Sequence, residues 1–486
     1  MQSQIDIFSK LVKDFMRNTP LAVAEGTPCS EVIERLATEK ASGATVIDSE
    51  GRPVGIVTER DVARKIAFKI SPETPVDEVM TTPVITILAK DYLYHSIGRM
   101  RRRGHRHMPV VNKKGLLVGI LNLKDALTVA SSQLVGQIDR LTHQGTLKGL
   151  KKVKAEQVQL AEELFESHLP AAEIQAVLTH INNDIYRRII DATLRDMAAE
   201  GWGKPPVNFT TIVFGSGGRG ENYLFPDQDN GFILEDYPDD DHNRIDSFFI
   251  ELAERMTRDL DAVGLPYCNG YCMAVNPLWR KTLPQWIEQI DLWGRKRNFV
   301  AIRLSDIFFD FQPVWGNPAL ARKLRNKVAG MIKKNHFFLQ QMFAEVKDHN
   351  VALGFFGGLV TEQEKKKYKG QINLKHTGTI PLVGTVRLLS LREGVKETST
   401  LRRIEALNGK GVLDDTETEL LSAAFELLTN TLLKNQIKAY KKDRKVNYYV
   451  DPDSLSKRKR ERLTDALKDI DNFKKRVRAE FTAEIF

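Results

Sequence analysis

The spacing of hydrophobic residues changes along the chain and divides it into three parts. Up to about residue 130, apolar runs of strand length, such as residues 44–47, alternate with segments at helical spacing. Between residues 172 and 197, apolar side chains recur every three or four positions, which predicts one long helix that buries a single stripe. From about residue 320 onward, long amphipathic patterns dominate and strand-like runs are few.

The front of the chain contains an internal repeat with a spacing of 64 residues. The segment GIVTERD at residues 55–61 recurs in similar form as GILNLKD at residues 119–125. Each copy is predicted to form a short strand, a helix, two strands joined by a glycine-containing turn, and a closing helix. A unit of about 60 residues buries little core by itself, so we expect the two copies to pack as a pseudo-symmetric pair.

The two copies resemble a pair of cystathionine β-synthase (CBS) domains. The resemblance implies that the motif G-x-x-[ST]-x-x-D binds an adenine nucleotide (AMP, ADP or ATP), with the hydroxyl at a phosphate and the acid on the ribose. Thr58 and Asp61 match this motif, whereas the second copy keeps Asp125 and has Asn122 in place of the hydroxyl. A hydroxyl beside the free N–H groups of a helix start also suits an anion on physical grounds. The alternative is a pair that only mediates dimerisation, with Thr58 as an ordinary helix cap.

A glycine-rich turn followed by two aspartates is the most informative segment of the chain. A buried strand is predicted at residues 211–214, and the turn GSGGRGE follows it at residues 215–221. The next strand-like run opens with Asp227 and Asp229. Alternation in a strand would place both carboxylates on one face, about 6–7 Å apart along the chain, where a divalent cation would relieve their repulsion.

This segment also offers groups for a phosphate. Oxygen ligands such as these carboxylates suit Mg²⁺ or Mn²⁺. Gly215 would allow the backbone to approach a phosphate closely, and Ser216 and Arg219 would donate hydrogen bonds to it. The sequence therefore predicts a site for a metal and a nucleoside triphosphate (NTP).

The pattern G-S-(x)10-D-x-D resembles the nucleotidyltransferase superfamily that shares the DNA polymerase β catalytic fold. The turn is most similar to the branch that uridylylates PII proteins and adenylylates glutamine synthetase. The order of CBS pair, this segment and a helical end is similar to the "domain of unknown function 294" group. The resemblance implies a third metal-binding carboxylate on a neighbouring strand, for which Asp310 in the strand-like run 306–314 is the best match. The alternative for Asp310 is an edge residue that faces solvent.

Two positions depart from the pattern of these relatives. They often carry Arg where Gln312 stands, and Asp where Asn373 stands. Residues 372–382 resemble the signature of the helical domain that accompanies the catalytic domain in this group. Lys375 in this signature is expected either to reach nucleotide phosphates across a cleft or to be an exposed structural lysine.

Together, these features predict a multidomain α/β protein. It would combine a tandem CBS pair (βαββα copies), a polymerase β-like mixed α/β nucleotidyltransferase domain and an all-α C-terminal bundle. The expected boundaries are 1–135 for the pair (copies at about 12–66 and 76–130), 136–200 for a helical linker and packing helix, 201–318 for the catalytic domain, and 319–486 for the C-terminal domain with its basic tail.

Composition and charge refine this picture in three respects. No apolar run approaches the roughly 20 residues that span a bilayer, and three cysteines cannot form a disulfide framework, so we expect a cytoplasmic protein. Cys268 and Cys272, which have no second cysteine pair or histidines nearby in the sequence, are interpreted as buried small side chains, with metal binding as the alternative. The net charge is +9, and +7 of it lies in residues 434–486. The tail could bind phosphates, but its apolar residues recur at helical spacing, which favours an amphipathic helix.

Two functions remain open on this evidence. The first is an enzyme that transfers NMP from NTP to a hydroxyl of a signalling protein or small molecule, gated by adenine nucleotides at the CBS pair. The second is a signal-transduction sensor whose nucleotidyltransferase fold is catalytically silent. Nucleic-acid modification rests only on the basic tail, and a homodimer is expected by analogy with CBS pairs. His105 and His107 are interpreted as packing or ligand-contact residues.

Overall fold

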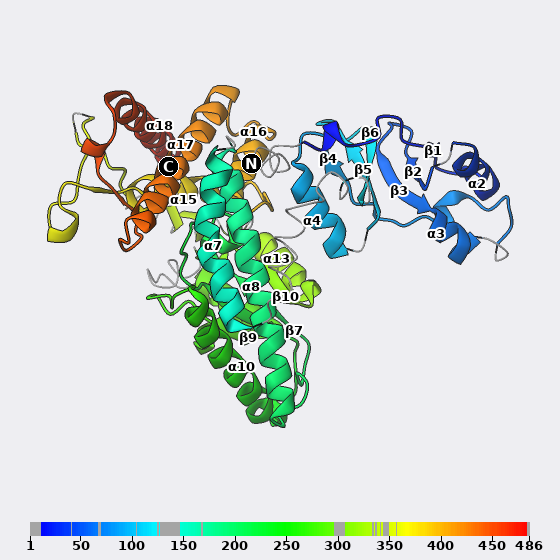
Figure 1. Ribbon diagram of the computed structural model, residues 1–486, viewed down its shortest axis with the longest axis horizontal. Helices are drawn as coiled ribbons and strands as arrows, with labels where there is room; N and C mark the ends of the chain where they lie inside the picture. The colour runs from blue at the N-terminus through cyan, green and yellow to red at the C-terminus, as the bar shows by residue number, and fades with distance from the viewer. Residues whose placement is uncertain are drawn as a thin grey trace. The chain divides into compact units, whose positions relative to one another are not determined.

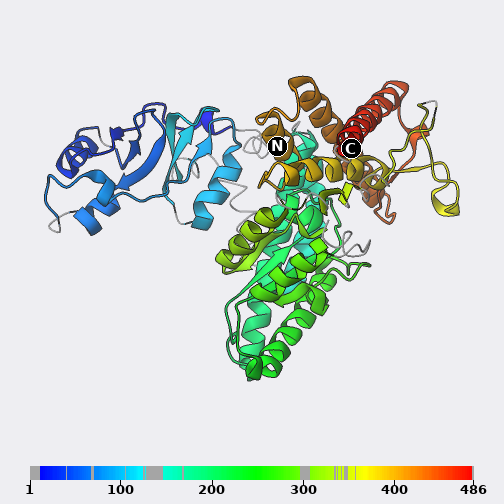
Figure 2. The ribbon, with the colours of Figure 1, turned by 180° about the vertical axis from the view of Figure 1, so that it is seen from behind.

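The computed structural model divides the chain into two compact units, shown in Figure 1 and from behind in Figure 2. The first unit comprises residues 1–143 and 167–169, and the second comprises residues 144–166 and 170–486. The structure describes residues 11–39, 41–66, 70–103, 105–123, 126, 146–166, 169–295, 307–332, 335, 338–340, 342–343, 349–355 and 357–483.

The first unit contains two three-stranded sheets of the same topology. Their strands are β1 (Ala22–Ala24), β2 (Gly43–Ile47) and β3 (Pro53–Thr58), then β4 (Ile87–Leu88), β5 (His107–Val111) and β6 (Leu117–Asn122). In each sheet the first strand is parallel to the second, and the second is antiparallel to the third. Gly43 pairs with Thr58, and 64 positions later His107 pairs with Asn122. The predicted repeat is confirmed down to the strand register.

The described helices of the first unit are η1 (Val12–Asp14), α2 (Cys29–Thr38), α3 (Glu59–Asp61), η2 (Val62–Ile66), η3 (Val76–Glu78) and α4 (Leu93–Arg103). The helix predicted to close the second copy falls largely outside the described residues. A register shift interrupts the central strand at the same point in both sheets, between Val46 and Ile47 and between Val110 and Val111. The central strands are almost wholly buried, as expected for strands covered on both faces.

The second unit is built on a four-stranded sheet in the order β10-β7-β8-β9. The strands are β7 (Phe209–Val213), β8 (Asn230–Leu234), β9 (Arg280–Thr282) and β10 (Gln312–Gly316). β7 is antiparallel to both β8 and β10, and β9 is parallel to β8. β7 and β8 are buried at every position, so the glycine turn between them starts from a rigid core.

Long helices surround this sheet. They are α7 (Leu147–Glu166), α8 (Ala171–Ala199), α10 (His242–Val263), α11 (Leu283–Arg295) and α13 (Pro318–Ile332), with the short turns η4 (Asp239–Asp241) and η5 (Pro277–Trp279). α7, α8 and α10 pack against one another, and Figure 1 shows them running side by side. α13 packs against β7, β8 and β10. The helix predicted from residues 172–197 is confirmed as α8.

Two strand boundaries differ from those expected. β8 begins at Asn230, so Asp227 and Asp229 lie in the extended segment just before it. β10 begins at Gln312, so Asp310 lies in a turn that precedes the strand. The prediction of a strand centred on Asp310 was wrong because its apolar neighbours Phe308 and Phe311 are buried by aromatic packing and not by strand pairing.

The described residues after α13 form mainly helices, with one small ribbon. The helices are η6 (Lys366–Tyr368), η7 (Lys375–Thr379), α15 (Ile380–Arg392), α16 (Thr400–Asn408), α17 (Asp415–Lys441), η8 (Pro452–Ser454) and α18 (Lys457–Ala483). β11 (Ile372–Asn373) pairs with β12 (Tyr449–Val450), which the expected all-α bundle did not include. α18 packs on α17 and buries Leu463, Leu467 and Ile470, so the basic tail is an amphipathic helix as predicted.

No helix among the described residues is both long and apolar enough to cross a bilayer.

Candidate active site

The glycine turn is the short helix α9 (Gly215–Arg219), which joins β7 to the segment before β8. The Phe214 amide donates to the Asp229 carbonyl at 3.0 Å, which places the turn beside the second aspartate. Gly215 has φ +50°, and a Cβ there would lie 3.2 Å from Asp229 Oδ2. At Gly218 a Cβ would lie 1.8 Å from the Asp310 carbonyl oxygen. Two of the glycines therefore let the turn pack against acidic residues.

Asp227 and Asp229 flank a buried glutamine that fixes their direction. Gln228 is fully buried, and its backbone N–H donates to Pro266 O at 2.9 Å. Its side-chain amide donates to the carbonyl oxygens of Thr257 and Leu265. Side chains of an extended chain point alternately to opposite faces, so Asp227 and Asp229 lie on the face opposite to that of Gln228. Asp227 is exposed and Asp229 is half-buried. Burial, together with the negative charge of Asp227, raises the pKa of Asp229 well above its ordinary value.

Lys375, at the start of η7, brings a positive charge to the two aspartates. Its ammonium group lies 4.2 Å from the ring centre of Tyr448. Although burial opposes the charge, Tyr448, Asp227 and Asp229 raise the pKa of Lys375, so the lysine remains protonated. A cation from the C-terminal helical region therefore lies within electrostatic reach of both carboxylates.

The predicted phosphate ligands of the turn have internal partners. Ser216 Oγ donates to Asn222 Oδ1 at 3.1 Å. Arg219 donates to Glu221 at 2.6 Å and to Asp310 at 2.8 Å, and little of its side chain is exposed. Arg219 therefore connects the glycine turn to Glu221 and Asp310.

Asp310 lies at the centre of a cluster of arginines. It is fully buried, and its carboxylate forms ion pairs with Arg219 (2.8 Å), Arg387 on α15 (2.6 Å) and Arg403 on α16 (2.7 Å). Burial alone would raise the pKa of Asp310, but these guanidinium groups hold it well below its ordinary value. The carboxylate thus joins the sheet to two C-terminal helices. Gln312 makes a similar link, because it donates to Thr398 Oγ1 at 3.0 Å.

The three predicted metal ligands do not form one group in the described part of the chain. The residues there that bring three possible ligand atoms within 4.8 Å of one another are Asp229, Cys268 and Cys272. Asp227 and Asp229 remain a suitable pair for Mg²⁺ or Mn²⁺, since both offer carboxylate oxygens and Asp227 is open to solvent. Asp310 has three guanidinium partners instead.

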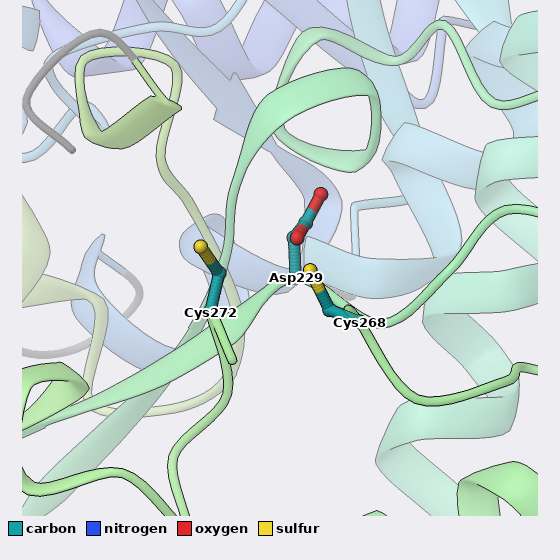
Figure 3. Close-up of side chains that lie close together, drawn as sticks. All are labelled: Asp229, Cys268 and Cys272. Atoms are coloured by element: carbon teal, nitrogen blue, oxygen red, sulfur yellow. The ribbon is translucent and has the colours of Figure 1, made fainter. Parts of the chain in front are cut away.

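The cysteines beside Asp229 were not assigned to the site from the sequence. Both are free and buried, as expected, and Figure 3 shows them with Asp229. A hydrogen bond from Cys272 lowers the pKa of Cys268 to about 6. The only sequence signal was their spacing of four, which is uninformative without knowledge that the loop folds back onto Asp229.

Lys154 on α7 anchors the arm that leads to the aspartates, and the sequence did not indicate it either. Its ammonium group donates to Leu224 O (2.7 Å), Gln157 Oε1 (2.7 Å) and Asn182 Oδ1 (2.9 Å). Burial lowers its pKa to about 7. Lys154 belongs to a lysine-rich stretch, and only its partners distinguish it from its exposed neighbours.

The first unit contains a cavity of about 410 Å³ at the first repeat motif. Thr58, Asp61 and Lys65 line it together with His105 and His107. Asp61 Oδ2 accepts hydrogen bonds from Thr58 N (3.1 Å) and Thr58 Oγ1 (2.7 Å), and Lys65 forms an ion pair with its other oxygen at 3.1 Å. Burial opposes the charge, but these partners lower the pKa of Asp61.

The second repeat motif has different surroundings. Asn122 donates to His107 Nε2 at 3.2 Å, and the same nitrogen lies 2.7 Å from Ser42 Oγ in the first copy. Asp125 lies outside the described residues. His107 therefore links the two copies beside the cavity, in keeping with a packing or ligand-contact role.

Family models match most of the chain. The model described as "CBS domain" matches residues 12–68 and 76–132. The model "Putative nucleotidyltransferase DUF294" matches residues 155–299, and "Putative nucleotidyltransferase substrate binding domain" matches residues 336–481.

Two curated relatives each cover about a quarter of the chain or less. Protein MJ1225 of Methanocaldococcus jannaschii is 31% identical over 121 residues, which are 25% of this chain and 43% of that protein. A 17.7 kDa protein of Acidianus ambivalens is 31% identical over 96 residues, which are 20% of this chain and 58% of that protein. The chain thus spans about half the length of these curated relatives.

Solved structures of CBS domain proteins cover a similar share of the chain. A CBS domain protein of Pyrobaculum aerophilum complexed with AMP is 29% identical, with a TM-score of 0.24, over 25% of this chain and all of that one. The CBS pair of protein MJ0100, in complex with 5′-methylthioadenosine and S-adenosyl-L-methionine, is 26% identical, with a TM-score of 0.23, over 25% of this chain and 95% of that one. By its family models, the chain joins a CBS domain pair to the domains described as "Putative nucleotidyltransferase DUF294" and "Putative nucleotidyltransferase substrate binding domain".

Proposed function

We propose that the second unit transfers a nucleoside monophosphate from an NTP to a hydroxyl of a protein or small molecule, in the manner of the PII-uridylylating enzymes. The observation that carries the proposal is the electrostatic interaction of Lys375 with Asp227 and Asp229. Two carboxylates that bind a divalent cation, together with a nearby ammonium group, suit a metal-bound triphosphate, because the carboxylates hold the metal and the ammonium group attracts the phosphates.

The proposed chemistry is a single displacement at the α-phosphorus. The acceptor hydroxyl loses its proton to solvent as its oxygen forms a bond to this phosphorus, the bond to the bridging oxygen of the β-phosphate breaks, and pyrophosphate leaves. A divalent cation held by Asp227 and Asp229 would neutralise the charge of the triphosphate. Lys375 supplies a further positive charge close to the two carboxylates, and Lys154 holds the arm before the aspartates in place.

Asp310 is proposed to position the site without touching substrate. Its ion pairs reach the glycine turn through Arg219 and the C-terminal helices through Arg387 and Arg403. It therefore helps to hold α9, which carries the turn, in register with the region that supplies Lys375.

The direct test is incubation of the full chain with Mg²⁺ and each labelled NTP. Pyrophosphate release with a panel of protein and small-molecule acceptors supports the proposal. NTP binding without pyrophosphate release would support the second candidate, a silent fold that acts as a sensor. The three arginines around Asp310 are the observation that favours this second candidate, because they form ion pairs with the carboxylate that was expected to complete the metal site.

Replacing Lys375 isolates its contribution. Lys375→Met keeps the alkyl chain on Tyr448 but removes the charge, and we expect kcat/KM for the NTP to fall by roughly 10–100-fold. Steady-state kinetics with varied NTP measures the change. Lys369→Met removes an exposed lysine from the same region and should leave the kinetics unaltered; equal kinetics for the two variants would rule out a substrate role for Lys375.

The first unit is proposed to sense adenine nucleotides and to regulate transfer. The cavity at Thr58 and Asp61 has the hydroxyl and carboxylate that a phosphate and a ribose require, and Lys65 adds a cation. AMP, ADP and ATP compete for such a site, and addition of each to the transfer assay reports the sign of regulation.

Asp61→Ala is expected to weaken adenine-nucleotide binding by about 10–100-fold, because two ribose hydroxyls lose their acceptor. Isothermal titration of the full chain with AMP, ADP and ATP measures the affinity. Glu34→Ala, an exposed change on α2, is the matched control. Unchanged affinity in Asp61→Ala would remove this cavity as the nucleotide site.

A further inference from the structure

A loop between α10 and η5 is tied to the segment that carries the aspartates. Asn230 N donates to Cys272 O at 2.9 Å, and Ala274 N donates to Asn230 Oδ1 at 2.9 Å. Nearer its start, Pro266 O accepts from Gln228 N at 2.9 Å. These bonds fix the loop at two points, so the residues between them have a defined position beside Asp229.

The loop turns so that its two cysteines lie on the same side. The Tyr271 amide donates to Cys268 O at 3.0 Å, which closes a turn, and Tyr271 has φ +52°. A Cβ built at Gly270 would lie 3.6 Å from each of the two sulfur atoms. Cys268 is 8% exposed and Cys272 is 2% exposed, whereas Tyr271 is 68% exposed. The turn therefore directs both thiols inward.

The two thiols and the Asp229 carboxylate form a compact group of ligand atoms. One atom from each residue lies within 4.8 Å of the other two. In the view of Figure 3 the Asp229 side chain lies between the cysteines, and the three side chains point the same way. Ligands of tetrahedral Zn²⁺ stand about 2.0–2.3 Å from the metal, so small side-chain rotations would bring these atoms to bonding distance.

The chemistry of the three ligands selects the kind of metal. Thiolates are soft ligands that prefer Zn²⁺ and similar cations, whereas Mg²⁺ and Mn²⁺ prefer oxygen. Two thiolates and one carboxylate leave a fourth position of a tetrahedral site for water, as in zinc sites with three protein ligands. Packing alone would explain two buried cysteines but not their convergence with a carboxylate.

We propose that Cys268, Cys272 and Asp229 bind a thiophilic divalent cation such as Zn²⁺, and that this binding inhibits nucleotidyl transfer by withdrawing Asp229 from the nucleotide's metal. Both thiols lose their protons to solvent as the two metal–sulfur bonds form. The inhibitory part rests on the proposed function, whereas the binding part does not.

Cobalt titration of the reduced, metal-free full chain tests binding. We expect thiolate-to-cobalt charge-transfer absorption that Zn²⁺ abolishes by displacement. Cys268→Ser and Cys272→Ser should each weaken binding on the order of 100-fold, and Asp229→Asn should weaken it with the thiols intact. Cys29→Ser, at the buried cysteine of α2 in the first unit, is the control and should bind normally. Circular dichroism establishes that each variant is folded.

The outcomes separate the two halves of the proposal. Absence of the absorption in the unmodified protein, or its persistence in both cysteine variants of the loop, would overturn the site. If binding holds, Zn²⁺ should inhibit transfer by the unmodified protein, a chelator should restore it, and Cys268→Ser should resist inhibition. Metal binding without transfer by any folded form would overturn the proposed function and leave the metal site standing.

Discussion

Asp229→Asn and Asp227→Asn are each expected to lower the rate of nucleotidyl transfer by a factor on the order of 10³. Each change keeps the size of the side chain but removes the negative charge that would hold the divalent cation against the triphosphate. Asp229 is the more enclosed of the two, so its charge acts in a lower dielectric and its loss should have the larger effect. Pyrophosphate release under saturating Mg²⁺ measures the rate.

A control variant shows whether the loss of activity is specific to these two carboxylates, and a folding measurement shows whether it results from unfolding. Asp236→Asn removes an exposed carboxylate just beyond β8 and should retain full activity. Because burial and the charge of Asp227 raise the pKa of Asp229, replacement by a neutral amide should not destabilise the fold. An Asp229→Asn protein that is folded and fully active would eliminate the carboxylate pair as the catalytic centre.

Asp310→Asn is expected to destabilise the second unit by about 3–5 kcal/mol. The change leaves the buried guanidinium groups of Arg219, Arg387 and Arg403 without their shared anion, and uncompensated buried charge is costly. All five tryptophans lie in the second unit, so their fluorescence during urea unfolding reports on this unit alone. The midpoint should move to lower urea.

The control for Asp310→Asn is a variant that breaks an ion pair exposed to solvent. Asp241→Asn breaks an exposed ion pair with Arg244 and should cost no more than about 0.5 kcal/mol, because solvent screens such pairs. A third metal ligand would behave differently from a positioning residue. Loss of transfer in Asp310→Asn with an unchanged unfolding midpoint would return Asp310 to the metal site.

The first unit could be derived from the sequence because its information is local and repeated. Residues 55–61 and 119–125 carry the same strand-to-helix signal at a fixed spacing, and the strand register follows that spacing. The glycine turn between β7 and β8 was predictable for the same reason, since apolar runs on both sides define the strands. The helix α8 followed from one uninterrupted apolar stripe.

The partners of Asp310 could not be derived in this way. Arg387 and Arg403 lie 77 and 93 positions further along the chain, and nothing local to them indicates a buried ion pair. The apolar neighbours of Asp310 suggested a strand, although aromatic stacking of Phe308 with Phe311 and Trp286 is what buries them. Cys268 and Cys272 posed the same difficulty, because their nearness to Asp229 depends on a loop folding back.

The matching register shifts in the two sheets of the first unit show how closely the two copies share one backbone. Both central strands are interrupted at equivalent points, Val46/Ile47 and Val110/Val111, although Thr58 ends the third strand of one sheet and Asn122 ends that of the other. An irregularity of this kind increases the local twist of a strand pair. The two sheets are therefore expected to twist alike at this point, whichever polar residue ends their third strands.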